Sequence, residues 1–347
     1  MKPSSDRKLR VLVVDDSLFM RAAVAKLLTT DGRFEVVGQA KDGADAIDRV
    51  AELKPDVVTM DFNMPKMNGA EAVRAIMARR PTPVIMFSAH TKQGARETFE
   101  ALAAGAVDFV TKPGGEVSAD LRGIAGDLVG KLIAASGARP RALAPIQQSK
   151  PKTPVHISTW PPTGPRVLVI GVSTGGPAAL SRVIPTLPAT IRFAIVIVQH
   201  MPASFTATLA ERLNGLSAVS VREARDGDIP AAGMVFIAPG DHHLEVADGG
   251  VLNLTDAPPV NGCRPSADVT MASAARVFGR RAIGLVMTGM GRDGAAGLSA
   301  IKQADGITLA QDQATSVIFG MPKAAIDAGV VDEVLSLDDI ARRLQEL

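Results

Sequence analysis

Short, apolar, β-branched segments alternate with longer segments of helical periodicity up to residue 135. Five strands are predicted, each nearly all apolar: Val11–Val14, Phe34–Val37, Val57–Met60, Val84–Phe87 and Val107–Val110. A helix is predicted after each strand, over Phe19–Leu28, Ala44–Leu53, Ala70–Ala78, Arg96–Ala104 and Leu121–Ala135. Because a strand that is apolar at every position is buried on both faces, the pattern predicts a parallel sheet with helices on both sides.

Regular periodicity is lost between residues 137 and 165. This stretch holds Lys, Ser and Gln among its prolines, which are Pro140, Pro145, Pro151, Pro154, Pro161, Pro162 and Pro165. The composition predicts an interdomain linker over 137–165, partly extended by its prolines. An ordered coil packed on one domain is the alternative for part of it.

A second α/β pattern begins at Arg166. Its predicted strands are Val167–Gly171, Phe193–Val198, Met234–Ala238, Ala282–Met287 and a short one at Ile307–Ala310. Two further segments, Leu244–Val246 and Val251–Leu254, are joined through a turn with two glycines and predict a β-hairpin. The chain is therefore predicted to form two α/β domains, 1–136 and 166–347. The second is expected to be a doubly wound, mostly parallel sheet with a β-hairpin.

Composition supports two folded domains and disfavours nucleic-acid binding, secretion and membrane insertion. A chain of 347 residues with 46% hydrophobic and 21% charged residues is typical of folded protein. A net charge of +2, one Trp and no Tyr disfavour a nucleic-acid-binding surface. Cys263 is the only cysteine, which excludes an intramolecular disulfide. The polar first ten residues and the lack of an apolar run of ~20 residues predict neither a secretory signal nor membrane insertion, so the chain is expected to be cytoplasmic.

Carboxylates follow two strands of the first domain. Asp15 and Asp16 come after the first strand, and Asp61 follows the third. In a wound sheet of order 2-1-3-4-5 these strands are neighbours, so the three side chains converge at the carboxyl edge. Three such carboxylates repel one another unless a cation lies between them, and hard oxygen ligands favour Mg²⁺. Lys112, after the fifth strand, and Ser88, at the end of the fourth, could both reach a phosphoryl group there.

This combination resembles the receiver domain of bacterial response regulators over about residues 9–135. The matching positions are Asp15-Asp16, Asp61, Ser88, Phe109 and Lys112-Pro113. Taken alone, an acidic pair after a strand is usually a helix cap, and a Lys-Pro pair is usually a turn; the set of positions carries the resemblance. A tyrosine is frequent in the family where this chain has Phe109.

The resemblance implies a flavodoxin-like (βα)5 fold in which Asp61 accepts a phosphoryl group from a histidine kinase. It implies that Mg²⁺ is held by Asp15, Asp16, Asp61 and the main-chain carbonyl of Asn63. It also implies that the switch residues Ser88 and Phe109 reorient on phosphorylation, with Lys112 contacting the phosphoryl group.

A second centre is predicted where the second domain begins. Gly171-Val172-Ser173-Thr174-Gly175 is a G-x-S-x-G turn between a strand and a helix that opens with Gly176-Pro177. Glycines on both sides allow a sharp turn that projects the Ser173 hydroxyl above the sheet edge. The helix N-terminus offers free amides that can stabilise an oxyanion. The motif alone is weak evidence, although it fits neither common phosphate-binding pattern.

A serine nucleophile needs a base, and a histidine base is usually oriented by a carboxylate. His200 ends an apolar strand, and Asp293 lies in a glycine-rich loop after another buried strand. His242 and His243 are rivals for the base, and Asp241 and Asp268 are rivals for the orienting role. His90 and His156 are poor candidates, because they belong to the first domain and the linker.

The order Ser…His…Asp differs from the Ser…Asp…His order of α/β-hydrolases. Four segments instead resemble the chemotaxis protein-glutamate methylesterase family: residues 171–176 around Ser173, Gln199-His200-Met201-Pro202, Cys263–Asp268 and Thr288–Gly294. They follow a receiver-like domain and a proline-bearing linker, so the likeness covers nearly the whole chain. The chain departs from the family at Cys263, where relatives often have histidine, and at Arg292, which replaces a commonly neutral polar residue.

This resemblance implies that Ser173 is the nucleophile, His200 the general base and Asp293 the orienting carboxylate. The Met290 amide is implied as the oxyanion donor, with Thr174 as an active-site neighbour. The implied substrates are glutamyl methyl esters on chemoreceptors, which yield methanol, and certain receptor glutamines, which yield ammonia. Hydrolysis needs no cofactor; Mg²⁺ serves receiver phosphorylation. The implied partners are methylated chemoreceptors and a chemotaxis histidine kinase.

Two centres in one chain suggest regulation. We expect the receiver to lie over or beside the serine cleft, and phosphorylation of Asp61 to weaken that docking. Two alternatives remain at this stage. One is a C-terminal domain that binds a partner or DNA without catalysis; its DNA-binding form is disfavoured, because residues 166–347 are long, strand-rich and nearly neutral. A serine hydrolase acting on another ester or amide stays open.

Overall fold

The structure is a computed structural model and describes residues 7–112, 121–138 and 166–347. The chain divides into two compact units, Met1–Ala144 (the N-terminal unit) and Pro145–Leu347 (the C-terminal unit). Most of the predicted linker, together with Pro113, lies outside the described residues. The last element described in the first unit ends at Ser136, and the first in the second unit begins at Val167.

The N-terminal unit contains a five-stranded parallel sheet of order β2-β1-β3-β4-β5. Its strands are β1 (Leu9–Val14), β2 (Phe34–Ala40), β3 (Val57–Asp61), β4 (Val84–Ser88) and β5 (Asp108–Thr111). The helices are α1 (Leu18–Asp31), α2 (Gly43–Leu53), α3 (Gly69–Arg79), α4 (Lys92–Ala104) and α5 (Ala125–Ser136), with a 3₁₀ turn, η1 (Leu121–Ile124), before α5. The predicted (βα)5 architecture and strand order are confirmed.

Local side-chain capping fixes where the first four helices start. Ser17, Asp42 and Thr91 each accept a hydrogen bond from a backbone amide in the first turn of α1, α2 and α4. Asn68 and Glu71 form a reciprocal capping box at the start of α3. Because each cap follows a strand closely, the loops that carry polar residues lie at the carboxyl ends of the strands.

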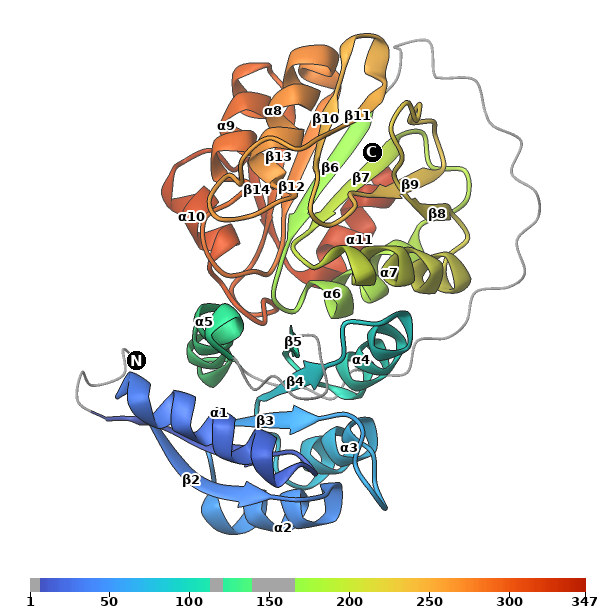
Figure 1. The fold of residues 1–347 in the computed structure, drawn as a ribbon. Coiled ribbons are helices and arrows are strands. Elements are labelled where there is room, and N and C mark those ends of the chain that lie inside the picture. The colour runs from blue at the N-terminus through green and yellow to red at the C-terminus, as the bar shows by residue number, and fades with distance from the viewer. Residues whose placement is uncertain (1–6, 113–120, 139–165) are drawn as a thin grey trace. The chain divides into compact units, whose positions relative to one another are not determined.

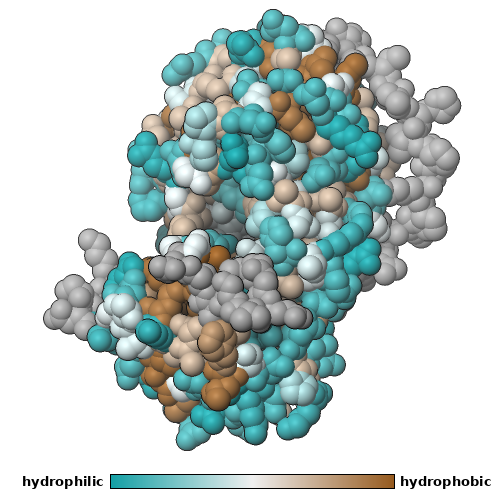
Figure 2. Space-filling model, viewed as in Figure 1, coloured by the Kyte–Doolittle hydropathy of each residue, from teal (hydrophilic) through white to brown (hydrophobic). Residues whose placement is uncertain are grey.

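The start of α1 carries two exposed apolar side chains beside the acidic residues. Leu18 is 70% exposed and Phe19 is 60% exposed. Hydrophobic surface gathers on the face of this unit that carries α1, among otherwise hydrophilic residues (Figure 2).

The C-terminal unit contains a seven-stranded sheet of order β14-β13-β12-β6-β7-β9-β8, in which all neighbouring strands are parallel. The strands are β6 (Val167–Val172), β7 (Ala194–Gln199), β8 (Ser220–Glu223), β9 (Met234–Ile237), β12 (Ala282–Val286), β13 (Ile307–Gln311) and β14 (Glu333–Leu335). The sequence pattern missed β8 and β14. Both are short edge strands with polar or partly exposed side chains, so neither shows the continuous apolar run of a central strand.

Helices cover both faces of this sheet (Figure 1). One face carries α8 (Ala267–Phe278), α9 (Ala295–Gln303) and α10 (Met321–Asp327), and the other carries α6 (Gly176–Val183), α7 (Ala203–Leu216) and α11 (Leu337–Glu346). The remaining 3₁₀ turns are η2 (Ile184–Thr186), η3 (Asp248–Gly250) and η4 (Gly279–Arg281). The predicted hairpin forms as β10 (His243–Val246) and β11 (Leu252–Thr255), but as a separate antiparallel pair that packs on α8 rather than as part of the wound sheet.

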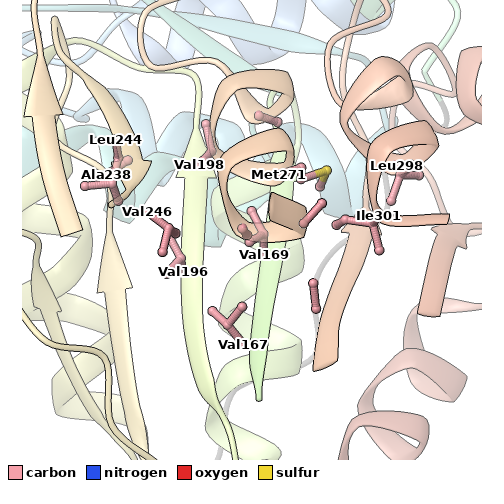
Figure 3. Close-up of a cluster of buried hydrophobic side chains, with 14 of the residues drawn as sticks. Val167, Val169, Val196, Val198, Ala238, Leu244, Val246, Met271, Leu298 and Ile301 are labelled. Atoms are coloured by element: carbon pink, nitrogen blue, oxygen red, sulfur yellow. The ribbon is translucent and has the colours of Figure 1, made fainter. Parts of the chain in front are cut away.

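The core on the α8 side follows the strand alternation. Alternate residues of the central strands, Val167 and Val169 of β6 and Val196 and Val198 of β7, meet Met271, Leu298 and Ile301 of α8 and α9 (Figure 3). Every second residue of a strand points to the same face, so Gly171, two residues after Val169, also faces α8. Ser173 and His200 follow directly after the ends of β6 and β7.

The chain reverses its direction of winding at β6. It first adds β7, β9 and β8 on one side of β6, and later adds β12, β13 and β14 on the other. The loops after β6, β7 and β12 therefore meet at a switch point on the carboxyl edge, where ligands bind in open α/β sheets. Within the described residues, no helix combines the length and the apolar character needed to cross a membrane.

Candidate active site

Ser173 lies in the tight turn between β6 and α6. Its amide donates to the Thr288 carbonyl (3.0 Å), and its carbonyl accepts from the Gly176 amide (2.7 Å). Gly175 adopts a left-handed conformation (φ 78°), which a residue with a side chain rarely adopts. A Cβ placed on Gly289 would lie 2.8 Å from the Ser173 Cβ. The serine is thus held closely between the loops that follow β6 and β12.

His200 follows β7, beside the serine. The His200 amide donates to the Val172 carbonyl (3.1 Å), which extends the pairing of β6 and β7 by one step. The Gln199 side-chain amide donates to the Ser173 carbonyl (3.0 Å), which further ties the two strand ends together. The candidate nucleophile and base therefore follow the ends of adjacent parallel strands.

Asp293 is the carboxylate that contacts the imidazole. Its Oδ2 lies 2.8 Å from His200 Nε2. The side chain is buried and also accepts from Ser266 Oγ (2.6 Å) and from the Ala267 amide (2.6 Å) at the start of α8. An ionised carboxylate can only accept, so Nε2 carries the proton of this hydrogen bond. The basic nitrogen of the neutral ring is then Nδ1.

The other imidazole nitrogen faces a thiol. His200 Nδ1 lies 3.7 Å from Cys263 Sγ. Among the described residues, no hydrogen bond joins the Ser173 hydroxyl to His200. Catalytic hydrogen bonds are often long or unformed before substrate binds, so this geometry remains compatible with a Ser-His-Asp site.

The rival residues lie in other contacts. His242 pairs with Asp256 at the surface (2.6 Å), and buried His243 accepts from the Ser266 amide (3.2 Å) and contacts the Pro258 carbonyl. Asp268 accepts from the Gly294 and Gly297 amides at the start of α9 (2.9 and 2.7 Å). The Asp241 amide donates to the Arg264 carbonyl. These contacts favour His200 as the base and Asp293 as the orienting group.

Electrostatics couple His200 and Asp293 strongly. Burial disfavours the imidazolium, but the hydrogen bonds to Asp293 and Cys263 outweigh it and raise the pKa of His200 to about 9. Burial would raise the pKa of Asp293, but the bonds from His200, Ser266 and Ala267 hold it well below its usual range. At neutral pH the pair is therefore mainly imidazolium and carboxylate, and the neutral base becomes more abundant as pH rises.

Met290 lies on the rim of the site and is 43% exposed. The loop is fixed by its neighbour Gly289, whose carbonyl accepts from the Gly320 and Met321 amides (3.1 and 2.9 Å). Within the described part of the chain, the Met290 amide has no acceptor, which suits an oxyanion donor. The side chain of Thr174 is buried beside the serine, and its carbonyl accepts from Thr288 Oγ1 (2.9 Å).

Sequence reasoning missed the groups that hold Asp293. Ser266 donates through its hydroxyl, and Asn261 Nδ2 bridges Asp293 Oδ1 (3.3 Å) and Asp268 Oδ2 (2.8 Å). Ser266 lies in the segment Cys263–Asp268, whose likeness to a family segment was the available signal. Nothing in the pattern around Asn261 indicates this role.

The carboxylates of the N-terminal unit converge as predicted. Asp15, Asp16 and Asp61 each offer an oxygen, and these oxygens lie within 4.8 Å of one another. Lys112 Nζ lies 3.1 Å from Asp15 Oδ2 and 2.9 Å from Asp61 Oδ1. Close carboxylate oxygens suit Mg²⁺, so the residues present fit the implied ion. Asn63 is exposed at this edge, and its side chain donates to Glu97 (3.1 Å).

Burial governs the charge of the candidate phosphoacceptor. Desolvation raises the pKa of Asp61 to about 6; the Lys112 ammonium opposes this shift and the Asp15 carboxylate adds to it. Without a bound cation, the Asp61 carboxylate is therefore partly protonated in mildly acidic solution.

Both proposed switch residues are buried in the N-terminal unit. Ser88 Oγ accepts from Thr98 Oγ1 (2.6 Å) and donates to the Gly94 carbonyl (3.1 Å). Phe109 is buried, and Lys131 Nζ lies 5.3 Å from its ring centroid. Their reorientation on phosphorylation stays a prediction.

Comparisons with known proteins give a family match for each of the two units. Residues 168–344 match the model of the CheB methylesterase family, and residues 11–119 match that of the response regulator receiver domain. A protein-glutamate methylesterase/protein-glutamine glutaminase of Symbiobacterium thermophilum is 47% identical, with 98% of this chain and 97% of the relative covered. A protein of the same name from Thermotoga maritima is 44% identical, with 99% of each covered.

A solved structure matches the C-terminal unit. The crystal structure of the Thermotoga maritima CheB methylesterase catalytic domain is 42% identical with a TM-score of 0.51, and the match covers 53% of this chain and 98% of that one. The site geometry, the two family matches and the full-length relatives lead to one conclusion: this chain belongs to the CheB protein-glutamate methylesterase family, with an N-terminal response regulator receiver domain.

Proposed function

We propose that this protein is a phosphorylation-activated hydrolase that demethylates glutamyl methyl esters, and deamidates glutamines, on chemoreceptors. The observation that carries the proposal is the partly buried His200–Asp293 pair (2.8 Å) at the strand end next to Ser173. The acidic pocket around Asp61 in the same chain supports control by phosphorylation.

In the first step, the Ser173 hydroxyl attacks the ester carbonyl and its proton passes to His200. The accepting nitrogen is Nδ1, because Nε2 is held by Asp293. The buried carboxylate stabilises the imidazolium that forms. His200 then gives the proton to the departing methoxide, so methanol leaves and Ser173 is acylated. Water, deprotonated by the same imidazole, releases the glutamate. With a glutamine substrate, ammonia leaves in place of methanol.

The negative charge of the tetrahedral intermediate needs donors at the rim. The Met290 amide is the proposed donor, in a loop that Gly289 holds against Ser173. One preorganised donor of this kind contributes about 10²–10³ in rate. The fixed position of the loop matters because the donor must meet the oxyanion rather than the substrate carbonyl.

Control is assigned to the receiver domain, which extends over 1–136 in this proposal and is joined by 137–165 to a catalytic domain at 166–347. A chemotaxis histidine kinase is the proposed phosphodonor for Asp61. Bound Mg²⁺, held by Asp15, Asp16, Asp61 and the Asn63 carbonyl, would neutralise charge as the phosphoryl group arrives. Lys112 would pair with the new oxygens, and Ser88 and Phe109 would transmit the change. We propose that the unphosphorylated receiver limits access to Ser173.

The test is methanol release from methylated receptor membranes, with and without a small-molecule phosphodonor. Stimulation by the phosphodonor, lost in Asp61→Asn, is expected. A fragment of residues 166–347 that is no faster than the unphosphorylated full chain would refute occlusion. Hydrolysis of simple aryl esters but not of methylated receptor would favour the alternative, a serine hydrolase with another substrate.

A further inference from the structure

Cys263 is held close to the candidate base by a tight turn. The turn is closed by two backbone hydrogen bonds, from the Val260 amide to the Cys263 carbonyl (3.1 Å) and from the Cys263 amide to the Val260 carbonyl (2.9 Å). The residue is partly exposed, and its sulfur lies 3.7 Å from His200 Nδ1. It is the single cysteine of the 347-residue chain. Its sulfur also lies 3.7 Å from the Asn261 carbonyl. The thiol is therefore accessible and within hydrogen-bond distance of both the imidazole and this carbonyl.

The thiol and the serine share one nitrogen. Nε2 of His200 is bonded to Asp293, which leaves Nδ1 as the proton acceptor for any nucleophile. In the structure the thiol occupies that position, and Ser173 makes no hydrogen bond to the ring among the described contacts. Cys263, His200 and Asp293 thus form a thiol–imidazole–carboxylate series, the arrangement that activates a cysteine for nucleophilic attack.

We propose that Cys263 is a reactive thiol, activated by the His200–Asp293 pair, and that its covalent modification stops hydrolysis at Ser173. The activation part stands on the geometry alone, and the inhibition part rests on the proposed function. The ligand class is a soft electrophile or a peroxide.

The chemistry with hydrogen peroxide is a two-electron oxidation of the sulfur. In molecules whose imidazole is neutral, the thiol proton passes to His200 Nδ1, the thiolate attacks one peroxide oxygen, the O–O bond breaks and the S–O bond forms. The departing hydroxide takes the proton from the imidazolium and leaves as water. The product is a sulfenic acid, which a thiol reductant returns to cysteine.

Modification blocks the base because of where the sulfur lies. Any group added to Cys263 Sγ starts 3.7 Å from Nδ1, the atom that must receive the Ser173 proton. An added oxygen or carbamidomethyl group would keep the serine hydroxyl from that nitrogen. Loss of hydrolysis should therefore follow the extent of thiol modification.

The first experiment measures labelling of the thiol in the full-length protein, which needs neither receptor nor esterase activity. Iodoacetamide alkylation is followed by intact mass for the unaltered protein, Ser173→Ala and His200→Gln, each checked for folding by thermal unfolding. Ser173→Ala is expected to label at least as fast as the unaltered protein. His200→Gln is expected to label about tenfold more slowly, because no imidazole takes the proton. Equal rates in His200→Gln and the unaltered protein would overturn the activation.

The second experiment measures methanol release after hydrogen peroxide treatment. The unaltered protein should lose activity in proportion to sulfenic acid formation and regain it with dithiothreitol. Cys263→Ala, compared with its own untreated rate, should be unaffected by the same dose. Full activity in a fully modified protein, or equal inactivation of Cys263→Ala, would overturn the inhibition. If Ser173 were not the nucleophile, the labelling result would be unchanged, so the two proposals fail separately.

Discussion

Asp268 and Asp293 cap the starts of each other's helices. Asp268, in the first turn of α8, accepts from the Gly294 and Gly297 amides at the start of α9. Asp293, just before α9, accepts from the Ala267 amide at the start of α8 (2.6 Å). Each carboxylate thus meets the positive end of the other's helix, and the exchange fixes Asp293 in front of His200.

This exchange predicts a linked loss of stability and activity in Asp268→Asn. Removing the charge weakens the cap of α9, so the free energy of unfolding should fall by about 1 kcal/mol. Methanol release should also fall, because the loop that carries Asp293 is less constrained. Chemical denaturation and the methanol assay measure the two effects.

Asp338→Asn is a matched control. Asp338 lies in the first turn of α11, is exposed, and within the described part of the chain forms an ion pair with Arg182 alone. It should change the free energy of unfolding by only a few tenths of a kcal/mol and leave hydrolysis intact. Equal effects of the two substitutions on activity would remove the structural role given to Asp268.

The charge state of His200 predicts an alkaline activity profile. Burial opposes the imidazolium, but Asp293 and Cys263 raise the pKa of His200 to about 9. The base works only when neutral, so activity is low below this pKa and rises as pH approaches and passes 9. The rate kcat/KM for methylated receptor should therefore increase between pH 7 and pH 9. A profile already half-maximal near the ordinary histidine pKa of about 6.5 would contradict the strong coupling.

Close packing at Gly289 predicts a severe effect of adding one methyl group. In Gly289→Ala the new Cβ would lie 2.8 Å from the Ser173 Cβ and closer still to Met321 Sδ. Overpacking of this kind costs about 1–3 kcal/mol and would displace both the serine and the Met290 amide. The substitution should lower both the free energy of unfolding, measured by chemical denaturation, and the rate of methanol release.

Gly215→Ala provides the comparison in the same unit. Gly215 lies inside α7, and a Cβ there would meet nothing within 4 Å. Alanine favours the helix, so this change should stabilise by about 0.5–1 kcal/mol and preserve activity. Retained activity in Gly289→Ala would show that the loop does not constrain the serine.

The receiver pocket predicts phosphorylation that depends on metal. The oxygens of Asp15, Asp16 and Asp61 lie within 4.8 Å of one another, so a cation is needed to offset their repulsion as a phosphoryl group arrives. Uptake of phosphoryl groups from a small-molecule donor should therefore require Mg²⁺. Chelation of Mg²⁺ should stop uptake and leave basal methanol release unchanged. Loss of basal hydrolysis on chelation would contradict the separation of the two centres.

The sequence predicted the central architecture because buried parallel strands are nearly uniform in hydrophobicity. Val167–Val172 and Ala194–Gln199 are buried at every position and were found within a residue of their ends. The edge strands Ser220–Glu223 and Glu333–Leu335 were missed, since pairing on one side only imposes no such pattern. The hairpin was found, but its place on α8 depends on tertiary packing that no local pattern encodes.

The candidate site was predicted as a set of residues but not as a set of contacts. The strand ends indicated that Ser173 and His200 could face the same edge of the sheet, since parallel strands share a carboxyl edge; that their strands are adjacent is known from the structure. The direction of the imidazole ring, with Nε2 toward Asp293 and Nδ1 toward Cys263, depends on side-chain rotation. So do the contacts of Ser266 and Asn261 with Asp293, which join segments distant in sequence.

The most direct measurement is methanol release from methylated receptor membranes by the unaltered protein and by Ser173→Ala, each supplied with a phosphodonor. We predict release by the unaltered protein and none above background by Ser173→Ala, with phosphoryl uptake at Asp61 equal in both. Turnover by Ser173→Ala at the rate of the unaltered protein would contradict the assignment of the nucleophile.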